Sequence, residues 1–206
     1  MTKLLKRWAM LVLLPALLAA CGAAEPKWAP DAEVARATYV HGAPYTLTLY
    51  TVVANKSGVG AHSALMVNAP GQRAIFDPAG TFYHPRLPER NDVIFGMSDP
   101  AVAFYIDYHA REDYDVIADT IEVSPEVATQ ALREIMAYGA VPKANCGRAI
   151  STLLQNVAGF EDLRTTMLPN ALMRQFKRAG GAAVVEETFV DTSPSRPDGM
   201  LLAPAL

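Results

Sequence analysis

The first twenty residues determine which part of this chain is available to fold. The chain starts with three cationic residues, Lys3, Lys6 and Arg7, and no acidic residue accompanies them. An apolar run follows at residues 9–19 and ends in small residues. This run is too short to cross a membrane comfortably, and the pattern is typical of a secretory signal peptide. We therefore expect residues 1–20 to be a signal that contributes nothing to the mature fold.

The end of this segment carries a more specific pattern. Leu18-Ala-Ala-Cys21-Gly22 resembles the lipobox of bacterial lipoproteins. The resemblance implies that Cys21 is acylated and becomes the mature N-terminus, with the membrane as its partner, since each buried CH₂ contributes about 0.8 kcal/mol to anchoring. Gly22 in place of Asp resembles lipoproteins of the outer membrane. We expect a lipid-anchored protein of the bacterial cell envelope that faces the periplasm; a plain signal peptide containing a cysteine is the alternative.

Composition limits the class of protein. The chain has 206 residues, of which 51% are hydrophobic and 19% charged, which suits one folded domain and argues against disorder. Three of the 18 Lys and Arg and none of the 21 Asp and Glu lie in residues 1–20, so the remainder carries 15 basic and 21 acidic side chains. This balance argues against a nucleic-acid partner. No further apolar run is long enough for an internal membrane span.

We expect a tether over residues 21–40 and a single domain over residues 41–206. β-Branched and aromatic content or turn boundaries predict strands at 45–54, 61–68, 73–77 and 114–123, with a turn at 69–72. Residues 78–100, rich in Pro, Gly and polar groups, are expected to form a long surface excursion. A last strand is expected to include Val184, Val185, Phe189 and Val190, before a Pro-rich tail.

Four segments are predicted to be helices. A short helix is expected at residues 101–109. Ser124 and Pro125 give an N-cap and a first-turn proline to a helix that ends near Gly139. Another helix begins after Asn145 as N-cap and ends near Gly159, and the last spans roughly 170–179. Together these elements predict an α+β fold with a small antiparallel sheet packed against helices.

Cys146 is the first candidate for chemistry. Because Cys21 is expected to carry lipid, Cys146 has no partner for an intramolecular disulfide, and a lone thiol in an oxidising compartment is a liability unless buried or used. Its place at the start of a helix favours a thiolate nucleophile, and the free helix amides can stabilise an oxyanion. The other interpretation is a small buried hydrophobe that packs beside Ala149, Ile150 and Leu153.

A nucleophilic cysteine needs a base, and the chain offers four histidines. His62 lies on a predicted strand, which would hold an imidazole rigidly. His84 is expected in a loop, His41 near the tether and His109 on a polar helix face. His62 is therefore our candidate base, against the alternative of a strand histidine without a task.

Asp77 is the candidate for orienting the imidazole. If the turn at residues 69–72 is tight, Ala69 pairs with Gln72, and Asp77 then lies opposite Ala64 on the face that His62 shares. A one-residue bulge would reverse this relationship. The alternative is that Asp77 and the following proline only initiate a turn.

These residues resemble those of a known family. Gly60-Ala-His62-Ser-Ala-Leu-Met-Val, then Ala-Ile-Phe-Asp77, then Asn145-Cys146 opening a helix are similar to the circularly permuted papain-like NlpC superfamily, which includes the lecithin retinol acyltransferase-like proteins. The resemblance covers roughly residues 45–160. It implies a permuted papain-like fold with Cys146 as nucleophile, His62 as base and Asp77 as orienting residue. Two features depart from the family: Gly-Arg follows the Asn-Cys pair instead of the familiar Glu-His, and the third residue is Asp instead of the His seen in many acyltransferase relatives.

We therefore expect a membrane-anchored cysteine hydrolase that attacks an amide or ester bond in a peptidoglycan peptide or an acyl lipid. The alternative is a catalytically inactive lipoprotein that acts as a binding or scaffold module. No cofactor or metal is expected, because the sequence contains no metal-ligand spacing and no phosphate-binding loop. Side chains suited to holding a polar ligand lie in or next to residues 78–113: Tyr83, Arg86, Tyr105, Tyr108, Arg111 and Tyr114.

Overall fold

The computed structural model describes residues 23–193. The predicted signal peptide, the lipidation site at Cys21 and the tail beyond Ser193 lie outside these residues. Across the described part of the chain, no helix has both the length and the apolar character needed to cross a membrane.

The domain is built on a seven-stranded sheet in which every strand is antiparallel to its neighbours, in the order β4-β5-β3-β2-β1-β6-β7. The strands are β1 (Thr46–Ala54), β2 (Gly60–Ala69), β3 (Gln72–Phe76), β4 (Glu89–Arg90), β5 (Val93–Phe95), β6 (Tyr114–Glu122) and β7 (Val185–Phe189). The predicted strands correspond to β1, β2, β3, β6 and β7, and the predicted α+β class is confirmed.

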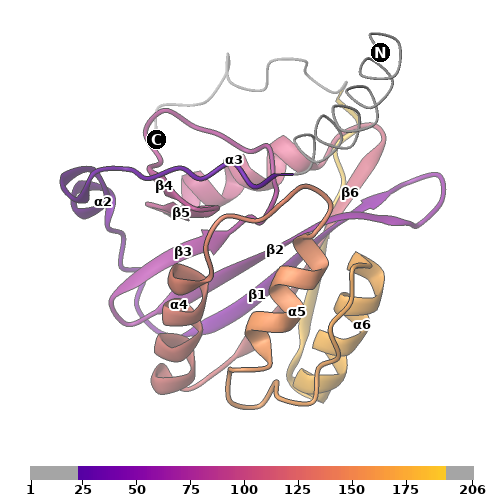
Figure 1. The fold of residues 1–206 in the computed structure, drawn as a ribbon. Helices are drawn as coiled ribbons and strands as arrows, with labels where there is room; N and C mark the ends of the chain where they lie inside the picture. The colour runs from indigo at the N-terminus through magenta and orange to yellow at the C-terminus, as the bar shows by residue number, and fades with distance from the viewer. Residues whose placement is uncertain (1–22, 194–206) are drawn as a thin grey trace, which may run out of the picture.

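Helices cover both faces of this sheet (Figure 1). They are α2 (Asp31–Ala37), α3 (Asp99–His109), α4 (Pro125–Tyr138), α5 (Cys146–Leu154) and α6 (Pro169–Gly180), with a 3₁₀ turn at Gly181–Ala183. One core joins alternate strand residues such as Leu47 and Leu65 to α4, α5 and α6. The other joins the intervening residues, such as Tyr50 and Met66, to α3. This alternation follows from the two-residue period of a strand.

The start of α4 follows the local signal in the sequence, whereas the start of α5 does not. The Ser124 hydroxyl accepts a hydrogen bond from the Val127 amide at 3.3 Å, as predicted for an N-cap. Asn145 precedes α5, but its side chain makes no capping hydrogen bond; its Nδ2 donates instead to the Lys143 carbonyl at 3.0 Å. The first turn of α5 is therefore not closed by the side chain that the sequence suggested, and α5 ends at Leu154 rather than near Gly159.

Residues 78–100 are not a surface excursion, and that prediction was wrong. They contain β4 and β5, and β5 extends the sheet by pairing with β3. Phe82, Leu87 and Met97 from this segment are buried in the core under α3. The apolar side chains outweigh the Pro and Gly content because they are buried on both faces of the sheet, with Val93 and Phe95 in one core and Ile94 in the other.

Part of the segment expected to be a tether packs on the domain instead. Residues 31–37 form α2, and the Ala29 amide donates to the Glu89 carbonyl at 3.0 Å. Arg90 Nε returns a hydrogen bond to the Ala29 carbonyl at 2.8 Å. These contacts fix residues near Ala29 to the β4 edge of the sheet.

Candidate active site

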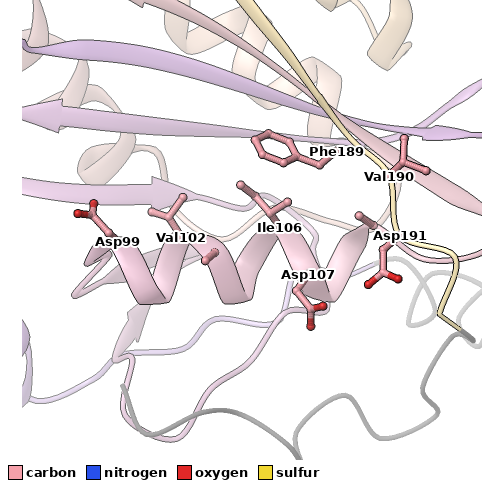
Figure 2. Close-up of a pocket in the computed structure, with 9 residues that line it drawn as sticks. Asp99, Val102, Ile106, Asp107, Phe189, Val190 and Asp191 are labelled. Carbon is pink, nitrogen blue, oxygen red and sulfur yellow. The ribbon is translucent and has the colours of Figure 1, made fainter.

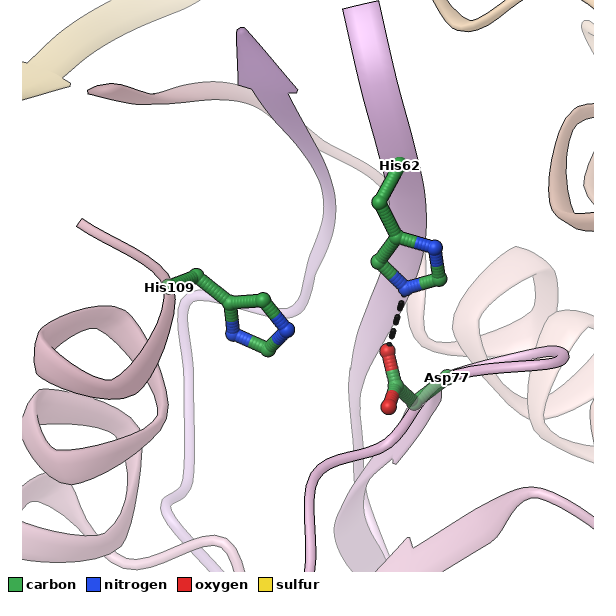
Figure 3. Close-up of side chains that lie close together, drawn as sticks. All are labelled: His62, Asp77 and His109. Atoms are coloured by element: carbon green, nitrogen blue, oxygen red, sulfur yellow. Dashed lines mark hydrogen bonds and ion pairs between the residues drawn. The ribbon is translucent and has the colours of Figure 1, made fainter. Parts of the chain in front are cut away.

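The β2–β3 hairpin has the register that the sequence predicted. Ala69 pairs with Gln72 and Leu65 with Phe76, and β3 ends there. The next residue, Asp77, therefore reaches the neighbourhood of His62. Figure 3 shows the two side chains pointing toward each other, with His62 Nε2 and Asp77 Oδ1 2.7 Å apart. The side chains are 16% and 3% exposed, respectively, so this contact is largely shielded from water.

A β-bulge is present, but it lies where it does not disturb this contact. In the β1–β2 pair, Val52 is opposite His62 whereas Val53 is opposite Gly60, so the irregularity falls on the far side of β2 from β3. Bulges alter strand twist and redirect side chains near functional sites. The start of β2 is also fixed by α6: a Cβ atom at Gly60 would overlap Asn170 Oδ1, and Asn170 Nδ2 donates to the Gly58 carbonyl at 2.7 Å.

Cys146 is the first residue of α5, and it is 5% exposed. His62 and the backbone of Ser63 and Gly147 influence the pKa of its thiol. Burial raises the pKa of the thiol, but hydrogen bonding and attraction to His62, together with the two amides, outweigh burial and lower it below the ordinary value. These are the influences that favour a thiolate over a thiol.

The pKa of His62 is raised and the pKa of Asp77 is lowered, so both groups favour their charged forms. Burial would lower the pKa of His62, but the charge and hydrogen bond of Asp77, aided by Cys146, raise it to about 10. Burial likewise opposes ionisation of Asp77, yet His62, His109 and a hydrogen bond from Tyr105 lower its pKa. Since Nε2 of His62 is bound to Asp77, Nδ1 is the ring nitrogen left for the thiol. The arrangement favours a thiolate–imidazolium pair supported by a carboxylate.

Close packing explains why a glycine, Gly147, follows Cys146. A Cβ atom at Gly147 would lie 2.9 Å from the Met167 carbonyl oxygen. Ser151 Oγ donates to the Gly147 carbonyl at 2.7 Å and accepts from the Thr166 amide at 3.0 Å. The chain before α6 therefore packs directly on the first turn of α5, which leaves no room for the Glu that follows the cysteine in the resembled family.

Two residues of α3 complete the site, and the sequence analysis did not assign them to it. The Tyr105 hydroxyl donates to Asp77 Oδ1 at 2.8 Å. The His109 ring stacks on His62, with centroids 5.8 Å apart and planes at 11°. Tyr105 and His109 are four residues apart and so share a helix face. That spacing was the available signal, but nothing in the sequence placed α3 over Asp77.

The other candidate side chains have different roles. His41 Nδ1 lies 3.5 Å from Asp99 Oδ1, and the His84 ring packs against the Phe104 ring. Of the side chains suggested for ligand binding, Tyr105 is buried against Asp77. Arg111 is also buried, where it bonds Asp107 and Asp191. These two therefore stabilise the fold or the site instead of lining a ligand surface.

The described residues contain one group with the composition of a metal site. His62, Asp77 and His109 have potential ligand atoms that all lie within 4.8 Å of one another (Figure 3). Two imidazoles and a carboxylate are common zinc ligands. However, the His62–Asp77 hydrogen bond of 2.7 Å occupies two of the three ligand atoms, so an ion would have to replace it. We assign the group to proton chemistry.

A separate pocket of about 390 Å³ lies between α3 and the end of β7 (Figure 2). Its apolar lining includes Val102, Ile106, Phe189 and Val190, and three carboxylates, those of Asp99, Asp107 and Asp191, complete it. Cys146, His62 and Asp77 are not among its lining residues. The pocket is therefore distinct from the candidate site, although α3 borders both.

Comparison of the chain with protein families, with curated proteins and with solved structures found no match. The chemistry of the site must therefore be argued from its own geometry. A thiol at a helix start, an imidazole on a strand and a buried carboxylate are the groups that can serve as nucleophile, proton carrier and orienting group.

Proposed function

We propose that this protein is a cysteine-dependent hydrolase of the bacterial cell envelope with a circularly permuted papain-like domain. The observation that carries the proposal is the 2.7 Å hydrogen bond between His62 Nε2 and Asp77 Oδ1, made by an imidazole that also lowers the pKa of the Cys146 thiol. The base precedes the nucleophile in the chain, which supports the permuted arrangement. Nucleophilic catalysis uses these three groups in these relationships.

In the first half of the reaction, the Cys146 thiolate attacks the carbonyl carbon of an amide or ester and forms a C–S bond. The negative charge that develops on the carbonyl oxygen is stabilised by free amides in the first turn of α5. The His62 imidazolium then donates its Nδ1 proton to the leaving amine or alcohol as the C–N or C–O bond breaks. An acyl-enzyme remains, and His62 is neutral.

In the second half, His62 removes a proton from a water molecule, and the resulting hydroxide adds to the acyl carbon. The C–S bond breaks, a carboxylic acid is released and the thiolate–imidazolium pair is restored. Asp77 stays ionised throughout, because its lowered pKa favours the carboxylate. Its role is to hold the His62 ring and to stabilise its positive charge.

The substrate class follows from the chemistry and from the predicted anchor on Cys21. An amide in a peptidoglycan peptide and an ester or amide of an acyl lipid are both accessible to an envelope enzyme, and the mechanism serves either. No cofactor is required, since the thiol and the imidazole supply the nucleophile and the proton transfer. The predicted membrane anchor would hold the domain beside both kinds of substrate.

A binding or scaffold module without catalysis is the second candidate. The observation that favours it is the 5% exposure of Cys146, because a substrate carbonyl must reach the sulfur. Iodoacetamide alkylation tests this directly. An activated Cys146 should react at pH 6 at least about tenfold faster than the thiol of a short unstructured peptide, since an unperturbed cysteine is almost fully protonated at that pH.

The matched variants are His62→Ala and His41→Ala, because His41 pairs with Asp99 and not with the thiol. His62→Ala should abolish the acceleration, whereas His41→Ala should retain it. Hydrolysis of fluorogenic ester and amide substrates by the wild-type protein and by Cys146→Ser provides the second measurement. If Cys146 is alkylated no faster than the peptide thiol, and hydrolysis is unchanged in Cys146→Ser, the protein is a binding or scaffold module and not a cysteine hydrolase.

A further inference from the structure

A second imidazole faces the His62–Asp77 pair from α3. His109 is the last residue of α3, and its ring lies nearly parallel to that of His62 at 5.8 Å. In Figure 3 one ring nitrogen of His109 points toward the His62–Asp77 pair. The mechanism proposed above does not use His109, so its position requires its own explanation.

The hydrogen bonding of His109 determines which of its nitrogens carries a proton. Nδ1 lies 2.9 Å from the backbone carbonyl oxygen of Tyr105, which can only accept. Nδ1 is therefore the donor, and Nε2 of the neutral ring is an acceptor. Burial, aided by the charge of His62 and opposed by that of Asp77, lowers the pKa of His109 to about 4. At neutral pH the ring adds no positive charge beside His62.

Aromatic rings hold His109 in this orientation. The Tyr105 and Tyr108 rings lie 4.4 and 4.9 Å from it, and the Phe82 ring lies 6.4 Å away. A polar ring in such surroundings costs free energy unless its polar atoms are used. Nδ1 is used by the Tyr105 carbonyl, which leaves Nε2 as the group whose presence packing alone does not explain.

We propose that His109 is a positioning residue whose neutral Nε2 stabilises the imidazolium of His62 while its ring keeps His62 Nδ1 turned toward the Cys146 thiol. The inference rests on the proposed function. Two residues one turn apart on α3 would then support the same site: Tyr105 donates a hydrogen bond to Asp77 Oδ1 at 2.8 Å, and His109 faces His62. His109 acts through His62 and need not touch the substrate.

The test compares His109→Phe, which keeps an aromatic ring without nitrogen, with His109→Gln, which can present an acceptor near the Nε2 position. The pKa of His62 is measured by NMR of its ring nitrogens, and Cys146 alkylation is measured from pH 4 to 9. His109→Phe should lower the pKa of His62 by about one unit and slow alkylation at pH 6 about tenfold. His109→Gln should remain within about threefold of the wild type.

An unchanged pKa of His62 in His109→Phe overturns the proposal, as does a loss of reactivity that Gln does not restore. If His109→Phe fails to fold, His109→Asn replaces it, because Asn can mimic Nδ1 but not Nε2; equal reactivity of the Gln and Asn variants then overturns the proposal. Failure of the hydrolase proposal is distinguishable: the wild-type thiol would show no acceleration, while His109→Phe would still lower the pKa of His62 and support the positioning role.

Discussion

Gly80 lies directly against the carboxylate of Asp77. A Cβ atom at Gly80 would overlap Asp77 Oδ2, and the Gly80 amide donates to the Asp77 carbonyl oxygen at 3.0 Å. The missing side chain therefore allows the carboxylate to take the position in which Oδ1 reaches His62. This turn residue is as much a part of the site's geometry as the residues that carry charge.

Replacing Gly80 by Ala should displace the carboxylate and weaken its bond to His62. A hydrogen bond to a charged group contributes about 1.5–3 kcal/mol, so we expect Cys146 alkylation at pH 6 to slow by roughly 10- to 100-fold. Gly71→Ala is the control, because a Cβ atom there has no neighbour within 4 Å. Equal alkylation rates in the two variants would show that the position of Asp77 does not matter.

The expected pH dependence of hydrolysis follows from opposite shifts in the pKa values of Cys146 and His62. The thiol pKa is lowered and the His62 pKa is raised to about 10, so the thiolate–imidazolium pair exists between the two values. Hydrolysis should rise through the lowered pKa of Cys146 and fall above about pH 10, where His62 loses the proton that the leaving group needs. Alkylation needs only the thiolate and should not fall there. A hydrolysis rate that rises only near pH 9 would contradict the pair.

Gly147→Ala should destabilise the domain. Its Cβ atom would be forced to within 2.9 Å of the Met167 carbonyl oxygen, which belongs to the backbone and cannot rotate away. Overpacking of this kind costs about 1–3 kcal/mol in free energy of unfolding, measurable by urea denaturation. Gly71→Ala again serves as the comparison, and a Gly147→Ala protein as stable as that control would refute the close packing.

The predicted anchor is tested on the full chain. Wild-type protein expressed in a bacterial host should incorporate labelled palmitate and partition into the detergent phase, whereas Cys21→Ser should do neither, because the acyl chains supply the membrane affinity. Cys146→Ser should partition as the wild type does. Labelling that depends on Cys146 instead of Cys21 would contradict the lipoprotein prediction.

The hairpin that carries His62 and Asp77 was predictable because its information is local. A short turn and alternating side chains fix the register of β2 on β3, and the pairing of Ala69 with Gln72 then determines what lies beside Asp77. The start of α5 at Cys146 was equally accessible, since helix periodicity begins there. The confirmed α+β class follows from the same local patterns.

The contribution of α3 was not predictable, because it depends on contacts across the sheet. Tyr105 is 28 positions from Asp77, and no periodicity relates them. A histidine at a helix end is usually solvated, so His109 was expected on a polar face. The short strands β4 and β5 have only two and three residues, too few for a pattern to emerge against the surrounding Pro and Gly.

Because Asn170 of α6 packs against Gly60 at the start of β2, a domain that keeps this strand in place must extend through α6. β2 carries the proposed base, His62, near its beginning, and that beginning packs against α6, which follows the proposed nucleophile, Cys146, in the sequence. A fragment ending after α5 would contain thiol, imidazole and carboxylate, yet the strand that aims the imidazole would have lost its support. During synthesis, all three groups are present before α6 is made, so the support that α6 gives to the start of β2 would be acquired after them.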